Sequence, residues 1–493
     1  MSRTAGWAVG GVCLFACQAV AGSIEITTRA ELLAVYRQAV MHNSDLAAAR
    51  ADFEARSEAI PLARANLLPT LSSTVSGEST RLERDTPSLT RARSGTTFQA
   101  NLKQPLFNAE SWFGLKAAEA STSQASLELS AKEQELILKC AEAYFETLRA
   151  SDDLAASETE EIALKQQRDQ AQARLVGGLA SITDVYDAQA AYDNAQANRK
   201  LAERKIEDAF EQLIRLTNHD YDSIEGIAHQ LPVLAPAPEN SKSWVDAALR
   251  QNLMLQANDQ AVLAAEQTLN QRQAGHAPTL DAIASYRKGD NDSFGYSNPT
   301  DFGRNGYQGN VAQSSVAIQI NVPLYNGGRT SAQARESYKR LTQSEELRET
   351  QRREVVLNTR NYYRAVNSDI EQILARKKTI LSSQGSLKAS KVGADIGTRN
   401  TVDVLNAQRQ LFTAVRDYNN ARYDYILNNL RLKLAAGTLS PLDLEGLAHY
   451  LKSDYQPRRD FLPPELTPDD FRTPHGVMPA KGPDKEIAEK AML

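Results

Sequence analysis

The chain has 493 residues, of which 42% are hydrophobic and 24% are charged, and its formal net charge is −5. Beyond the N-terminus no apolar run reaches the roughly 18–20 residues of a membrane-spanning helix, which excludes a protein of many such helices. The acidic balance argues against nucleic-acid binding, which usually needs a basic face. Only 25 glycines and 18 prolines interrupt the chain, and this low share favours long helices. Composition does not exclude a membrane β-barrel, because the strands of such a barrel alternate between apolar and polar residues and are only half apolar.

The N-terminus has the pattern of an export signal, residues 1–21. A short basic region precedes a small, apolar stretch at 5–16, and Ala-Val-Ala at 19–21 fits a cleavage site of the small-x-small type. A buried N-terminal helix and lipidation at Cys17 are the alternatives. Cleavage after the signal would leave Cys140 as the only cysteine, so the mature chain would form no intrachain disulfide.

The chain carries one internal duplication. Three pairs of similar segments recur in the same order at a nearly constant offset, which chance rarely produces. The pairs are 69–71 with 278–280, 105–108 with 323–326, and 178–189 with 397–408. A Pro-rich stretch separates the two halves. We therefore predict an export signal at 1–21, a first repeat at 22–230, a linker at 231–242, a second repeat at 243–451 and a flexible, Pro-rich C-terminal tail at 452–493.

Each repeat is predicted to run helix, strand, strand, very long helix, tight turn, long helix. The strand signal is an alternation of apolar and polar residues, as in Phe98, Ala100 and Leu102. Such runs are typical of a membrane barrel, although a soluble, half-buried sheet has the same pattern. The predicted strands are about 70–82 and 96–107, then about 279–288 and 311–324, with polar loops at 83–95 and 289–310.

The longest predicted helices are residues 108–176 and 328–396, which contain no proline. At 1.5 Å per residue, each would reach about 100 Å. Ile137, Ala141 and Tyr144 begin a series with alternating spacings of four and three, which is a heptad seam. Small and polar residues occupy parts of the seam, which favours many helices around a hollow. An ordinary antiparallel coiled coil is the alternative.

The turns that join the long helices match in chemistry. A glycine in each can adopt the left-handed conformation that ends a helix. A capping residue then precedes an aspartate by three positions, the spacing of a capping box, and Asp184 and Asp403 are these aspartates. Capping is their plain interpretation, but at the narrow end of a tube both would also act on ions. The predicted helix-turn residues are Gly178, Ser181, Gly397 and Asn400.

These segments together resemble the TolC-type outer-membrane channel family. The resemblance rests on residues 397–408, 420–425, 436–439 and 178–185, and it covers roughly 32–451. It implies a mainly α fold with a membrane β-barrel, built from a duplicated helix-strand-strand-helix-helix unit. In such a homotrimer each subunit gives four strands to a 12-stranded barrel and its helices to a long periplasmic α-helical barrel. Four strands alone cannot close a barrel, since about eight is the practical minimum.

The resemblance also implies a gate at the helix turns. Asp184 and Arg399 look like a pair that holds the gate, with Thr183 beside it, and Asp403 looks like the acid of the constriction. Two positions depart from the family. Residue 394 is alanine, where members often carry tyrosine, and Asn406 stands where a second acid often sits. We expect a tip that opens more easily and binds cations less. A solvated helix-end charge is the alternative for Arg399.

The implied function is an exit duct for secreted proteins, small toxic compounds or both. Its expected partners are a periplasmic adaptor and an inner-membrane transporter, either ABC or proton-driven, and its expected location is the outer membrane of a Gram-negative bacterium. A periplasmic adaptor protein is the alternative, disfavoured by the two hairpins and two strand pairs. The chain contains no P-loop and no G-x-S-x-G or H-E-x-x-H motif, so we expect no enzyme, cofactor, metal or nucleic-acid partner.

Overall fold

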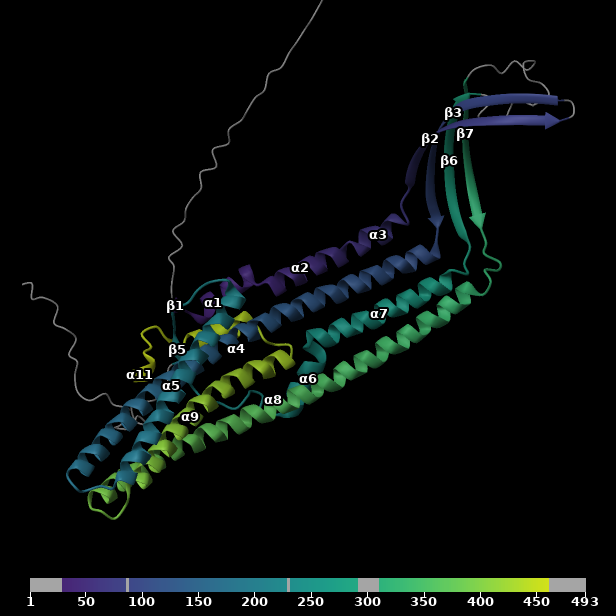
Figure 1. Ribbon diagram of the computed structural model, residues 1–493. Coiled ribbons are helices and arrows are strands. Elements are labelled where there is room, and N and C mark those ends of the chain that lie inside the picture. Colours follow the sequence, from purple (N-terminus) through teal and green to yellow (C-terminus); the bar gives the residue numbers. More distant parts are fainter. Residues whose placement is uncertain (1–28, 86–87, 228–230, 291–309, 461–493) are drawn as a thin grey trace, which may run out of the picture.

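The structure, a computed structural model, describes residues 29–85, 88–227, 231–290 and 310–460. The predicted export signal lies outside these residues, as does most of the predicted loop 289–310. Figure 1 shows a long, narrow molecule, in which helices run side by side, a sheet extends from one end and two helix turns lie at the other.

Helices account for most of the described chain. The two longest end within one residue of their predicted limits. Those that precede the strands are broken into pieces, because Asn43 and Asn252 adopt extended conformations between helices. The helices are α1 (Leu32–His42), α2 (Ser44–Ser57), α3 (Ala59–Ala65), α4 (Ala109–Val176), α5 (Ile182–Thr217), α6 (Ser241–Gln251), α7 (Leu253–Ala274), α8 (Arg329–Asp395), α9 (Thr401–Ala435), α10 (Pro441–Ala448) and α11 (Pro457–Asp460).

One antiparallel sheet contains the four long strands. They are β2 (Thr70–Asp85), β3 (Ser88–Phe107), β6 (Thr279–Asp290) and β7 (Asn310–Asn321), in the order β2-β3-β6-β7. Both outer strands therefore have an unpaired edge within the described chain. The predicted loop at 83–95 is wrong, since β2 and β3 pair as far as Asp85 and Ser88. The sequence of this part carries no regular alternation of apolar and polar residues, so it gave no strand signal. β7 ends before the predicted 324, near Pro323, which has no backbone N–H to donate.

The two faces of the sheet differ in polarity. Leu71 pairs with Leu102, and Ala284 with Val316, on a face whose large apolar side chains are exposed in the single chain. The opposite face is polar. There Lys103 forms an ion pair with Asp281 at 2.9 Å, and Ser285 and Ser315 share a hydrogen bond of 2.7 Å. In the part of the chain that the structure describes, no helix is both long and apolar enough to span a membrane.

The main apolar core lies where α4 and α9 pass each other, with α1, α5, α8 and α10 around them. The predicted seam of α4 is buried there, with Tyr144 and Leu148 fully enclosed. Along α8 the buried side chains recur at seven-residue spacing: Val366, Ile373, Ile380 and Leu387. Partly buried Tyr363 and Ile370 also pack against this core, so the seam of α8 is only partly enclosed.

The residues that follow α10 are attached to this core. Strand β8 (Leu451–Lys452) pairs with β5 (Gly226–Ile227), and Tyr455 is buried beyond it. A second short pair joins β1 (Arg29–Ala30) to β4 (Ser223–Ile224). The prediction of a separate, flexible tail is therefore wrong for 452–460, because an aromatic side chain and strand pairing fix this segment. The remainder of the predicted tail lies outside the described residues.

Candidate functional site

The turn between α4 and α5 forms at the end farthest from the sheet. Gly178 has φ +72°, the left-handed conformation, and its N–H donates to the carbonyl of Leu175 at 2.9 Å. Ser181 then caps α5: its Oγ accepts from the N–H groups of Thr183 and Asp184 at 3.1 and 3.3 Å. The Asp184 carboxylate accepts from the Ser181 N–H at 2.9 Å, which completes a capping box.

The turn between α8 and α9 repeats this geometry. Gly397 has φ +77°, and the Asn400 Oδ1 accepts from the N–H of Asp403 at 2.8 Å. The Asp403 carboxylate accepts in return from the Asn400 N–H at 3.2 Å. Asn406 lies one turn further along α9, exposed, where its Oδ1 accepts from Arg409 at 3.2 Å. Both aspartates are therefore helix caps, as their plain interpretation required.

A cavity of about 730 Å³ separates the two hairpins just above these turns. Asp184 and Arg399 both line it, but no ion pair joins these two side chains among the described residues. Ala394 lines it as well. The cavity also carries the cations Arg174 and Lys391. Thr183, Asp403 and Asn406 are not among its lining residues.

One link between the hairpins was not predicted. Arg174, near the end of α4, forms an ion pair with Asp395, the last residue of α8, at 2.8 Å. Both side chains are largely exposed. Asp395 follows directly after Ala394, and the pair lies on the lining of the same cavity. No local spacing relates residues this far apart in the sequence, and only the tertiary fold brings the ends of α4 and α8 together.

Further from the turns, a buried carboxyl group joins three segments. Asp152 of α4 accepts hydrogen bonds from the hydroxyl of Tyr423 at 2.5 Å and from that of Tyr455. Burial raises the pKa of Asp152 to about 7, although these hydroxyls and nearby Arg422 favour the charged form. Burial also raises the pKa of both tyrosines, which therefore remain donors.

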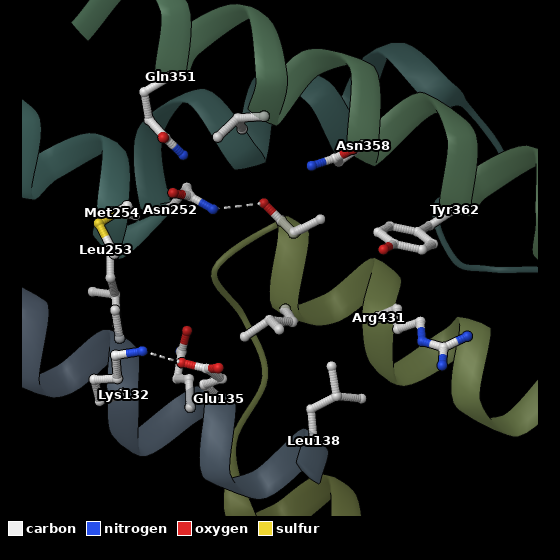
Figure 2. Close-up of a pocket in the computed structure, with 15 residues that line it drawn as sticks. Lys132, Glu135, Leu138, Asn252, Leu253, Met254, Gln351, Asn358, Tyr362 and Arg431 are labelled. Atoms are coloured by element: carbon white, nitrogen blue, oxygen red, sulfur yellow. Dashed lines mark hydrogen bonds and ion pairs between the residues drawn. The ribbon is translucent and has the colours of Figure 1, made fainter. Parts of the chain in front are cut away.

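A second cavity, of about 270 Å³, lies at the other end of α9 (Figure 2). Here the break between α6 and α7 meets the end of α9, and the Asn252 Nδ2 donates to the carbonyl of Ala435 at 3.0 Å. Lys132 and Glu135 of α4 form an ion pair on one wall at 2.7 Å, while Arg431 lines another. Across the described ranges, no group of three or more His, Cys, Asp or Glu side chains could hold a metal ion.

Long hairpins with a small open-edged sheet at one end and capped turns at the other define a class of protein, the outer-membrane channel subunit. The solved structure of CusC has this fold, with a TM-score of 0.73 over 83% of this chain and 92% of that chain at 18% identity. The chain belongs to the outer membrane efflux protein family, whose model matches residues 35–219 and 244–438.

Curated relatives agree with this membership. Outer membrane protein TolC of Vibrio cholerae is 32% identical over 436 residues, 88% of this chain and 97% of that protein. Alkaline protease secretion protein AprF of Pseudomonas aeruginosa is 28% identical over 361 residues, 73% of each chain. The predicted resemblance to TolC-type channels and the predicted location in the outer membrane are confirmed. The family is one of transport proteins and not of enzymes, and membership favours the channel over the adaptor alternative.

Proposed function

We propose that this protein is the exit duct through which inner-membrane transporters pass their cargo across the periplasm and the outer membrane. The observation that carries the proposal is the four-stranded sheet with two unpaired edges and one apolar face. Unpaired backbone groups in lipid each cost several kcal/mol, so such a sheet needs partner strands on both sides. A trimer supplies them, since three copies give 12 strands, an even number that can close.

The helices would then form a periplasmic tube that continues the barrel. A periplasmic adaptor and an inner-membrane transporter, ABC or proton-driven, are the partners that such a duct requires. One relative is named for protease secretion, and the family is named for efflux, so secreted proteins and small toxic compounds are both candidate cargo. Crosslinking in cells, followed by co-purification, tests which transporter is bound.

The gate of this duct is proposed at the two turns. Asp184, Thr183 and Arg399 would hold neighbouring turns together, because Asp184 and Arg399 already line one cavity. Asp403 would form a ring of carboxylates at the constriction. Asn406 adds no charge to this ring, and Ala394 leaves the hairpins with one link fewer. These departures favour a tip that opens readily and binds cations weakly.

Recording from single channels in planar bilayers tests the gate. Arg399→Ala should raise the resting conductance, because it removes one of the cations that line the cavity between the hairpins. Arg409→Ala is the matched control, an exposed arginine on α9 outside the cavity. Equal resting conductance in both variants and the unmodified protein would exclude Arg399 from the gate.

The same recordings test the constriction. Asp403→Asn keeps a side chain that can cap α9 but removes its charge, so divalent cations should block the channel less strongly. Asp417→Asn, higher on the same helix, is the control and should leave the block unchanged. Unaltered block in the Asp403 variant would place the cation site elsewhere.

Cell fractionation tests the duct itself. Recovery of the protein only in the soluble periplasm, without heat-modifiable gel mobility, would contradict the proposed duct.

A further inference from the structure

Helices α4 and α9 are joined by a series of polar contacts that stops part of the way along α4. The contacts fall at three levels of α9 about one heptad apart, with two adjacent residues at the middle level, as expected of antiparallel helices in fixed register. We call this series the polar ladder. From the sheet end toward the turns, it consists of Glu142–Arg431 at 2.8 Å, Arg149–Asp424 at 2.6 Å, Asp152–Tyr423 at 2.5 Å and Glu160–Arg416 at 2.5 Å.

The last contact of the polar ladder is also a well-enclosed one. Glu160 is only 5% exposed, so its carboxylate depends on Arg416 for a partner. Arg416 also donates to the Oγ of Ser157 at 3.2 Å, which fixes the guanidinium against α4. Removing one partner of a buried ion pair leaves a charge without compensation, so this contact resists separation.

Below Glu160 the packing changes. A small apolar contact between Leu164, Ala195 and Leu405 comes first, and the 730 Å³ cavity follows. The side-chain Oε1 of Gln408 is buried in this region without a hydrogen-bond partner. The ion pair between Arg174 and Asp395 crosses the hollow at its far end, and it is exposed, where ion pairs contribute little.

We infer that the Glu160–Arg416 contact is the pivot about which the α8–α9 hairpin swings away from α4–α5 when the turns separate. This inference rests on the proposed gating of the turns. Above the pivot the polar ladder fixes the two hairpins in register. Below it, one small apolar contact at Leu164, a hollow and one exposed ion pair hold the hairpins together less firmly. Glu160 and Arg416 are thus positioning residues of the gate.

The segment that follows α10 strengthens the fixed part. Tyr455 reaches Asp152 from outside the hairpins, and its ring lies against Gly226, where an added Cβ would sit 2.1 Å from a ring carbon. Arg458 also pairs with Glu158 of α4 at 2.6 Å. Three segments therefore meet directly above the pivot, so the swing cannot extend past Asp152 without releasing this segment.

Paired variants of the full-length channel in planar bilayers test the pivot. Arg416→Met and Glu160→Gln remove the lowest contact, so each should raise the resting conductance several-fold. Arg416→Lys keeps the charge and should stay close to the unmodified protein. Arg431→Met and Glu142→Gln break the more exposed ion pair at the upper end of the polar ladder, and they should leave resting conductance unchanged. Equal effects of upper and lower variants would overturn the inference.

Hydrogen exchange gives a readout that needs no conduction. In the unmodified protein, amide protection along α4 should fall below Glu160, and along α9 it should fall on the turn side of Arg416. Arg416→Met should move this boundary upward to Asp152, whereas Arg431→Met should not move it. Uniform protection from Glu142 to the end of α4 would overturn the pivot. Absence of conductance in every variant would instead contradict the proposed duct, and the exchange boundary would still decide the pivot.

Discussion

At the scale of single residues, Asp152 is a carboxyl group that is buried and has a raised pKa. It is 3% exposed, and its pKa of about 7 places its change of charge near neutral pH. Its two tyrosine partners come from α9 and from the segment after α10, so its protonation affects contacts between three parts of the chain. A carboxyl group with this pKa binds its proton more tightly in the folded state than in the unfolded chain.

The stabilising contribution of Asp152 should decrease as the pH rises. The pKa rises from 3.8 to about 7 on folding, so the contribution of Asp152 to stability is fully present below 3.8. It is lost as pH rises through 7, by roughly 4 kcal/mol in all. Asp152→Asn, which is neutral at every pH, should flatten the dependence. Thermal melts between about pH 4 and pH 8 measure it, and an equally steep dependence in the variant would contradict the assignment.

The candidate site was predicted only as far as local patterns reach. Gly178, Ser181 and Asp184 are separated by a few residues, and a capping box is a local structure, so their roles could be predicted from spacing. The pairs Arg174–Asp395 and Glu160–Arg416 could not. Each joins residues more than two hundred positions apart, and the side chains that meet depend on the register between long helices, which the heptad pattern alone leaves undetermined.

At the scale of secondary-structure elements, the helix ends differ in what surrounds them. Gly437, after α9, has φ +73°, and a Cβ added there would lie 2.2 Å from the carbonyl oxygen of Gln251. Gly397 has a similar φ of +77°, but open space surrounds its Cβ position. The first glycine lets α9 end tightly against α6, while the second only reverses the chain.

This contrast predicts that a glycine-to-alanine substitution lowers the stability of the protein by different amounts at the two positions. Gly397→Ala should cost only the strain of a left-handed alanine, about 1–2 kcal/mol. Gly437→Ala adds a clash with backbone, which no side-chain rotation relieves, so its loss of stability should be clearly larger. Loss of the helical circular-dichroism signal on heating measures both variants. Equal shifts of the midpoint would show that the end of α6 moves aside freely.

Elements with strong periodicity were predicted well, and those without it were not. The limits of α4 and α8 follow from heptads, the lack of proline, a cap at Asn108 or Gly328 and a glycine just after each helix. The strand pairing near Asp85 and Ser88 was missed because a polar hairpin has no apolar alternation to detect. The attachment of 452–460 was missed because it depends on Tyr455 and on pairing between β5 and β8, both of which are distant contacts.

At the scale of the whole molecule, the sheet has unpaired edges on β2 and β7 and an exposed apolar face. In the proposed trimer, β7 of one copy would pair with β2 of the next, and the apolar face would contact lipid. The ion pair between Lys103 and Asp281 on the other face would then lie toward the lumen, where water can surround it. Apolar strand positions are thus expected to contact lipid, and polar strand positions are expected to face the lumen.

Substitutions at neighbouring positions can distinguish the environments of the two faces of the sheet. Ile318→Lys places a charge on the apolar face, where lysine near the membrane midplane costs about 2–4 kcal/mol, so it should reduce the yield of heat-modifiable trimers. Gln319→Lys, one residue further on the polar face, should assemble normally. The yield of trimers on gels after membrane extraction measures both. Equal yields would mean that lipid does not contact the apolar face.

The position of the Glu160–Arg416 contact determines how much of α4 lies beyond the proposed pivot. About 16 residues separate Glu160 from the end of the helix, which is a rigid arm of about 24 Å. A rotation of about 10° at Glu160 would therefore displace the turn by about 4 Å, the rise of about three helical residues. A long, proline-free helix thus converts an angular change too small to disturb the core into an opening at the far end. Strengthening or shifting that one contact would rescale the aperture of the duct without any change at the turns themselves.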